Sequence, residues 1–98
     1  MNNWEWLVSA IPAGQAEAVS MAYLARLFGI SKRELRKEIE DARKAGNLIC
    51  SCDKGYFMPQ TEPEIRDYAR RVKARIRTGA LCLAPFLREI RRAEGIRT

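Results

Sequence analysis

The sequence contains no histidine, which removes the commonest general base and metal-ligating side chain from this chain. It contains three cysteines, Cys50, Cys52 and Cys82, and this odd number argues against a disulfide framework. A structural zinc site usually takes four cysteine or histidine ligands, and Asp53 is the candidate fourth ligand beside the cysteine pair. We therefore expect no metal site and no cofactor. Cys50 and Cys52 lie on the same face of an expected strand, where packing is the simpler role and redox sensing stays open.

Long apolar runs are also missing. No segment approaches the roughly 18 apolar residues that a transmembrane helix requires. The first residues lack the basic start and apolar run of a signal peptide, so we expect a cytoplasmic protein, in a bacterium or a phage-infected cell. A chain of 98 residues has core enough for one small domain. With no paired carboxylates in an apparent cleft and no glycine-rich phosphate loop, we expect neither an enzyme nor a small-molecule substrate.

Acidic residues are in deficit, with 12 Asp and Glu against 18 Lys and Arg, which gives a net charge of +6. The excess is uneven, because residues 59–98 carry ten basic and five acidic side chains, a net of +5. Residues 31–58 carry seven basic and five acidic side chains, a net of +2. This charge favours a polyanionic partner for the second and third segments of the chain.

The first third of the chain predicts two short helices. The first has an apolar face, Asn3 as its N-cap and a stop at Pro12 and Gly14; the face consists of Trp4, Leu7, Val8 and Ile11. A loop over 15–19 follows, with a short strand expected at 18–19. Ser20 can cap the second helix, whose apolar positions are Tyr23, Leu24, Leu27 and Phe28. Gly29 ends this helix.

The middle of the chain predicts a third helix followed by a hairpin. Ser31 and Glu34 have the spacing of a capping box, in which each side chain satisfies a free backbone N–H. The apolar stripe of the helix is Leu35, Ile39 and Ala42, and Gly46 and Asn47 provide its stop. Residues 48–52 and 56–58 then predict two short strands, joined by a turn in which Gly55 can adopt a left-handed conformation.

Residues 62–92 predict one long, kinked helix. Its apolar or small residues repeat at spacings of four and three without a break; they are Ile65, Ala69, Val72, Ile76, Gly79, Leu83, Phe86 and Ile90. Two separate helices would have no reason to keep this register past Pro85. The alternative is an antiparallel helical hairpin that turns near Gly79, because proline disfavours an unbroken helix.

Residues 24–39 form a unit of two helices around a turn glycine. Ala25 lies four residues before Gly29, where a small side chain lets the helix backbones approach each other. This segment, followed by the expected hairpin over 48–58, resembles the winged helix-turn-helix of bacterial repressors. The amino-terminal domain of biotin-ligase repressors and small phage and prophage regulators are similar. The resemblance covers residues 4–58 and implies a mainly α fold with a small β-hairpin, a winged helix-turn-helix followed by a long C-terminal helix.

The resemblance implies sequence-specific binding of double-stranded DNA by a small bacterial or phage transcriptional regulator. Helix 31–45 would enter the major groove and the hairpin would lie on the backbone or minor groove. The residues expected to contact DNA are Ser31, Lys32, Arg33, Arg36, Lys37, Arg43 and Lys54. Acidic residues alternate with these cations, as on a solvated, salt-bridged helix face. The alternative function is a protein-interaction adaptor that uses the same fold in phage replication or assembly.

The C-terminal segment suggests two further roles. A run of cations surrounds the apolar seam and is expected to make secondary phosphate contacts or to form a solvated exterior; it consists of Arg70, Arg71, Lys73, Arg75 and Arg77. The seam itself predicts a homodimer, through Ile65, Ala69, Val72, Ile76, Leu83, Phe86 and Ile90. The alternative is that this helix folds back onto Trp4, Trp6 and Leu7. We therefore divide the chain into a winged helix-turn-helix domain, residues 1–59, and a helical dimerisation extension, residues 60–98.

Overall fold

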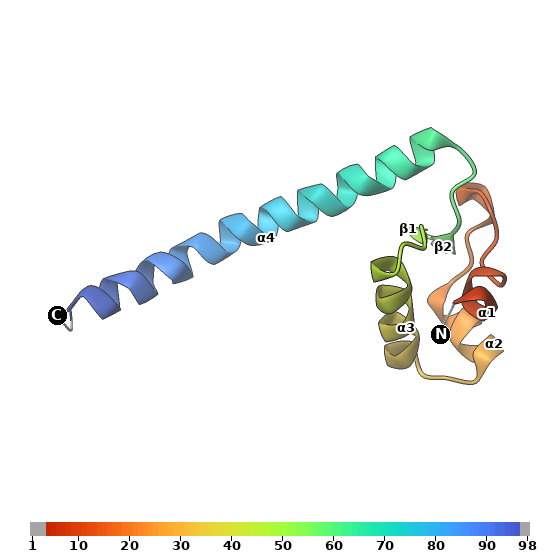
Figure 1. Ribbon diagram of the computed structural model, residues 1–98, viewed down its shortest axis with the longest axis horizontal. Coiled ribbons are helices and arrows are strands. Elements are labelled where there is room, and N and C mark those ends of the chain that lie inside the picture. Colours follow the sequence, from red (N-terminus) through yellow and green to blue (C-terminus); the bar gives the residue numbers. More distant parts are fainter. Residues whose placement is uncertain (1–3, 97–98) are drawn as a thin grey trace. The chain divides into compact units, whose positions relative to one another are not determined.

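The structure is a computed structural model that describes residues 4–96 and is mainly helical, with one small hairpin (Figure 1). In chain order the elements are α1 (Glu5–Val8), the 3₁₀ turn η1 (Gln15–Glu17), α2 (Met21–Phe28), α3 (Lys32–Lys44), β1 (Cys50–Cys52), β2 (Gly55–Phe57) and α4 (Glu62–Ile96). The chain divides into two compact units, the first ending at Tyr68 and the second beginning at Ala69. The first unit therefore extends beyond residue 59, the expected end of the N-terminal domain.

The core of the first unit gathers one apolar face from each of its first three helices. Leu7 of α1, Leu24 of α2 and Leu35 of α3 are all fully buried. Ile11 is also buried, and Trp4 and Val8 pack against the same cluster, so the four apolar residues face the core as predicted. The helix itself is shorter than predicted, because α1 ends at Val8 and Ile11 lies beyond it. The predicted N-cap Asn3 lies outside the described residues.

The helix α2 begins and ends where its local sequence predicts. The Ser20 hydroxyl accepts a hydrogen bond from the Tyr23 N–H at 3.0 Å, and Gly29 ends the helix in the left-handed conformation with φ of 65°. Its buried residues are Leu24 and Ala25, whereas Tyr23 and Leu27 are 48% and 53% exposed. Two of the four predicted apolar positions, Tyr23 and Leu27, are therefore largely exposed, while Phe28 packs against the core cluster.

The helix α3 carries the predicted capping box. The Glu34 N–H donates to the Ser31 hydroxyl at 3.0 Å, and the Ser31 N–H donates to the Glu34 carboxylate at 2.8 Å. These two bonds satisfy backbone donors that a helix otherwise leaves open at its N-terminus. Leu35, Ile39 and Ala42 are buried, as their spacing predicts.

The strands β1 and β2 pair antiparallel, with Cys50 opposite Phe57 and Cys52 opposite Gly55. The strand β1 is shorter than predicted, since Leu48 lies outside it and is 54% exposed, whereas β2 has the predicted length but begins and ends one residue earlier. The other edge of β2 pairs with Val19, through hydrogen bonds of 2.7 and 2.9 Å between the backbones of Val19 and Tyr56. The strand expected at 18–19 is thus a single bridge, which ties the loop before α2 to the hairpin.

Gly55 permits this close approach. Its φ is 137°, and a Cβ atom at this position would lie 1.9 Å from the Val19 carbonyl oxygen. No residue with a side chain can occupy that space without displacing the Val19 backbone. Position 55 therefore requires glycine for two reasons, the close contact with the Val19 backbone and the positive φ of the turn.

The helix α4 runs from Glu62 to Ile96 as one element that contains both Gly79 and Pro85 (Figure 1). The alternative of a helical hairpin turning near Gly79 is therefore wrong, and the helix continues past the predicted end at residue 92. Its first turn belongs to the first unit. There the Glu64 carboxylate accepts hydrogen bonds from the backbone N–H groups of Gln15 and Gln60, at 2.9 and 2.6 Å.

Candidate functional site

The exposed face of α3 is the candidate site, and the burial of its apolar stripe determines which side chains it presents. Because Leu35, Ile39 and Ala42 face the core, Arg33 and Lys37 project from the opposite side of the helix. Lys32 and Arg36 are also exposed, on the flank between that side and the core.

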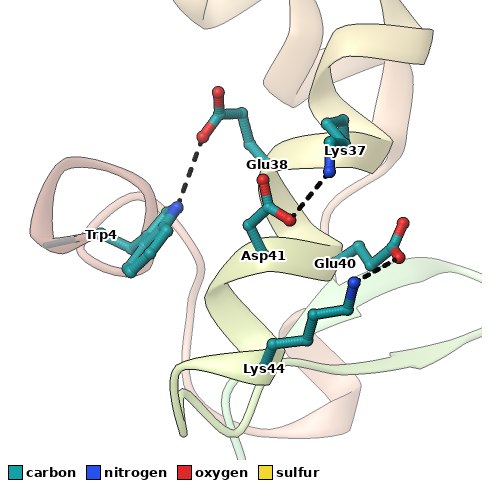
Figure 2. Close-up of polar contacts among 6 residues, drawn as sticks. All are labelled: Trp4, Lys37, Glu38, Glu40, Asp41 and Lys44. Atoms are coloured by element: carbon teal, nitrogen blue, oxygen red, sulfur yellow. Dashed lines mark hydrogen bonds and ion pairs between the residues drawn. The ribbon is translucent and has the colours of Figure 1, made fainter. Parts of the chain in front are cut away.

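Two acidic side chains at the start of α3 are engaged within the protein. Glu34 completes the capping box with Ser31, and these hydrogen bonds lower the pKa of its carboxyl group. Glu38 accepts a hydrogen bond from the indole Nε1 of Trp4 at 3.3 Å, which places it on the α1 side of α3 (Figure 2).

Two further acids lie later in the helix and pair with lysines one turn away. Lys37 Nζ lies 3.1 Å from Asp41 Oδ1, and Lys44 Nζ lies 3.1 Å from Glu40 Oε2 (Figure 2). The Asp41 carboxylate raises the pKa of Lys37 by its hydrogen bond and its charge. Both pairs are solvent-exposed, so each contributes little to stability. Each pair nevertheless offsets the positive charge of its lysine, Lys37 or Lys44.

The cations at the start of α3 remain unneutralised. Lys32, Arg33 and Arg36 are exposed, and none of them forms an ion pair with any residue in the range 4–96. The positive charge of the helix is therefore concentrated on its first turns, next to the Ser31 N-cap. The alternation of acids and bases in the sequence concealed this asymmetry, which depends on which acids have partners.

Arg43 lies on the flank of α3, as its spacing predicts, but it makes contacts within the protein that the spacing does not predict. Its Nε donates to the Ile49 carbonyl oxygen at 2.8 Å, and its guanidinium carbon lies 5.9 and 5.2 Å from the ring centroids of Tyr56 and Tyr68. The side chain is half-buried, so its guanidinium is held between α3, the hairpin and the first turns of α4. We therefore assign Arg43 a structural role and leave it out of the candidate interface.

The hairpin contributes one further cation. Lys54 is exposed in the turn between β1 and β2, beside Asp53. The next aromatic residue, Tyr56, is buried, and burial raises the pKa of its hydroxyl even though Arg43 and Arg36 act in the opposite direction. Arg36 lies about two helical turns before Arg43, which contacts Tyr56, so Arg36 is on the hairpin side of α3.

A hollow of about 410 Å³ flanks the other side of α3. Its lining combines apolar and charged residues, namely Trp6, Ile30, Arg33, Glu34, Lys37 and Glu38. Trp6 packs edge-on against Phe28, with ring centroids 4.8 Å apart, yet remains 41% exposed. The position of Trp6 beside Arg33 and Lys37 could not be predicted from the sequence, because it depends on how α1 packs against α3.

The second unit carries the other predicted cations and most of the predicted seam. The run comprising Arg70, Arg71, Lys73, Arg75 and Arg77 is exposed throughout. The large seam residues of this unit are exposed as well: Ile76, Leu83, Phe86 and Ile90 are 66%, 50%, 68% and 54% exposed.

Three other features of the described part of the chain are its possible metal ligands, its cysteines and the hydropathy of its helices. Among residues 4–96, no group of three or more histidine, cysteine or carboxylate side chains is arranged to hold a metal ion. Cys50 is buried, Cys52 is half-buried and Cys82 is exposed, and all three are thiols. No helix within the described range is long and apolar enough to cross a membrane. Comparison of the chain with protein-family models, curated proteins and solved structures gives no match.

Proposed function

We propose that this protein binds double-stranded DNA through the first turns of α3. In this proposal α2, the turn at Gly29 and α3 act as a helix-turn-helix, and the β1–β2 hairpin acts as its wing. The observation that carries the proposal is the exposed cluster of Lys32, Arg33 and Arg36, whose charges no carboxylate among the described residues neutralises.

The chemistry of these side chains suits a DNA groove. A major groove admits one α-helix, and residues near the N-terminus of that helix reach the base edges. Arginine can donate two hydrogen bonds to a guanine, and lysine can contact guanine or phosphate. The helix N-terminus at Ser31 adds a partial positive charge that favours a nearby phosphate.

The resemblance of residues 24–39 to bacterial and phage repressors supports a more specific role. We propose a small transcriptional regulator of bacterial or phage origin that acts in the cytoplasm. Lys54 would contact phosphate or the minor groove from the hairpin, and Lys37 would add to the helix contacts when DNA competes for its pairing with Asp41.

A titration of labelled DNA duplexes at low salt, followed by fluorescence anisotropy, tests the proposal. Arg36→Ala should weaken binding by about 1–3 kcal/mol if Arg36 contacts a base. Lys44→Ala is the matched control, because it removes one positive charge from the same helix at a position that pairs with Glu40. Undetectable binding across varied duplexes at low salt would refute the proposal.

Selection of bound duplexes from a random pool, at two salt concentrations, then separates sequence readout from simple charge attraction. Enrichment of a common sequence that persists at the higher salt concentration indicates specific recognition. Binding that disappears as salt rises, without enrichment, indicates phosphate contacts alone.

A second candidate function, a protein-interaction adaptor, is favoured by the exposed apolar side chains of the first unit. Trp6, Tyr23 and Leu27 are 41%, 48% and 53% exposed on α1 and α2. Exposed aromatic and leucine side chains are common at protein interfaces. If the protein is instead an adaptor in phage replication or assembly, any affinity for DNA should not depend on the cations of α3. Alanine substitutions should then leave that affinity unchanged; the positions are Lys32, Arg33, Arg36 and Lys37.

A further inference from the structure

We propose that α4 forms an antiparallel two-stranded coiled coil with a second copy of this chain, with Arg75 of each copy facing Glu89 of the other. The surface concerned lies within the second unit, on residues 69–93. The proposal does not depend on DNA binding, since it uses a different surface and a different partner.

The first observation is the seam of apolar side chains along this unit. Phe86 is 68% exposed and Ile76 is 66% exposed, values that are unusual for large apolar residues repeated along one helix face. They belong to a heptad pattern in which Ala69, Ile76, Leu83 and Ile90 occupy the a positions and Val72, Gly79, Phe86 and Ala93 occupy the d positions. Such a pattern is satisfied when a second helix covers the seam.

The second observation is the order of side-chain sizes along the seam. In an antiparallel coiled coil each a residue packs beside a d residue of the other helix. We place the two-fold axis on the seam side of the helix, at the level of residue 81. Gly79 then packs beside Leu83 of the second copy. By the same geometry Ile76 meets Phe86, Val72 meets Ile90 and Ala69 meets Ala93. A glycine thus faces a leucine at the centre of the seam, two layers of larger residues follow on each side, and alanines face each other at the ends.

The third observation is the charge beside the seam. In an antiparallel pair the g positions of the two helices face each other. With the same axis, Arg75 lies opposite Glu89 of the second copy, and this pair occurs twice by symmetry. Glu89 is exposed and contacts Arg92 on its own helix, so its carboxylate lies at the surface where a second arginine can reach it. A shift by one heptad removes the pairing between Arg75 and Glu89.

A parallel, in-register arrangement loses these advantages. It places Gly79 beside Gly79 and Phe86 beside Phe86 in successive d layers. It also places Glu89 opposite Glu94 of the second copy, because g positions then face e positions five residues later. The basic run at residues 70–77 would moreover lie beside its own copy, with five cations facing five. The antiparallel arrangement sets it opposite residues 85–92, which carry three arginines and Glu89 and therefore a smaller excess of positive charge.

Sedimentation equilibrium of the full chain tests whether the seam is the interface. The wild-type protein should sediment as two chains, and Ile76→Glu should sediment as one, with a dissociation constant raised at least a hundredfold. Leu81→Glu is the matched control, because Leu81 is 65% exposed on the same helix but lies opposite the seam, and this variant should remain dimeric. Circular dichroism of both variants shows whether the helices are retained. A monomeric wild type at high concentration, or a monomeric Leu81→Glu with its helices intact, overturns the proposal.

Charge reversal tests the orientation. Arg75→Glu and Glu89→Arg should each raise the dissociation constant about tenfold, since each places like charges opposite one another twice per dimer. The double variant should return to near the wild-type value. Arg77→Glu combined with Glu89→Arg is the control, because Arg77 does not face the second copy and should show no rescue. If the effects of Arg75→Glu and Glu89→Arg simply add, the antiparallel arrangement is wrong.

Discussion

The guanidinium of Arg43 lies 5.2 Å from the ring centroid of Tyr68, while the Nε of the same side chain donates to the Ile49 carbonyl oxygen at 2.8 Å. One cation on α3 therefore joins the segment before β1 to the first turns of α4. The Arg43 Nη2 atom is buried and has no hydrogen-bond partner among the described residues. The contacts with Tyr56 and Tyr68 are thus an important part of what holds this side chain in place.

Replacing Arg43 with lysine should destabilise the protein although the charge is kept. Lysine cannot reproduce both the Nε hydrogen bond to Ile49 and the cation–π contact of the guanidinium with Tyr68. We expect a loss of about 1.5–3 kcal/mol in the free energy of unfolding, measured by urea denaturation. Arg36→Lys, the same substitution at an exposed position of the same helix, should stay within about 0.5 kcal/mol of wild type. Equal stabilities of the two variants would contradict the structural role of Arg43.

Gly55→Ala should be more damaging than the same substitution at Gly46. Both glycines have positive φ, of 137° and 104°, so alanine is strained at either site, at a cost of about 1–3 kcal/mol. At Gly46 a Cβ atom meets nothing within 4 Å, whereas at Gly55 it would lie 1.9 Å from the Val19 carbonyl oxygen. The bridge between Val19 and Tyr56 must therefore open in Gly55→Ala. Thermal unfolding should show the larger decrease in Tm for this variant, and a smaller decrease than for Gly46→Ala would be inconsistent with that contact.

Local signals in the sequence were sufficient to predict where most of the helices begin and end. The Ser20 and Ser31 caps, the Glu34 partner and the end of α2 at Gly29 depend on neighbours within four residues, and each occurs as predicted. The long helix was also predictable, because its apolar register continues across Gly79 and Pro85. A pattern of this kind is informative because the residues that determine it are close in the chain.

Contacts between distant segments were not predictable in the same way. Helical spacing places Arg43 on the same flank as Arg36, and only the positions of Tyr68 and Ile49 distinguish the two arginines. The exposure of Leu27 likewise depends on which side of α2 faces the core. The winged helix-turn-helix, the DNA contacts and the dimer stay predictions, because each concerns a relationship to known folds or to a molecule outside the chain.

Acid should weaken the attachment of α4 to the loop before α2. Backbone hydrogen bonds from Gln15, Gln60 and Thr61 lower the pKa of Glu64 from its ordinary value of 4.5. A carboxyl group whose folded pKa is lowered stabilises the protein above the unfolded pKa, and this contribution is lost as pH falls through the folded value. We therefore expect the stabilisation from Glu64 to be complete at neutral pH and to decline below about pH 4.5.

The variant Glu64→Gln tests this dependence. Its Tm should be lower than that of wild type at neutral pH, and the difference should shrink as pH falls below 4.5, measured by circular dichroism. Glu62→Gln, two residues earlier, removes an exposed carboxylate that pairs with Arg66 and should leave the contribution of Glu64 in place. A difference between Glu64→Gln and wild type that stays constant from pH 7 to pH 3 would exclude this role for the Glu64 charge.

The salt dependence of DNA binding should separate the contribution of the hairpin from that of α3. Lys54 lies in the exposed β1–β2 turn, and a contact with one phosphate contributes about 0.9 to the slope of log affinity against log salt concentration. Lys54→Ala should therefore weaken binding to all duplexes by a similar factor and reduce the slope by about one. Arg36→Ala should instead reduce the difference in affinity between preferred and unrelated duplexes, because a base contact carries sequence information. An unchanged slope for Lys54→Ala would mean that the hairpin does not touch the phosphate backbone, and the binding surface would then be confined to α3.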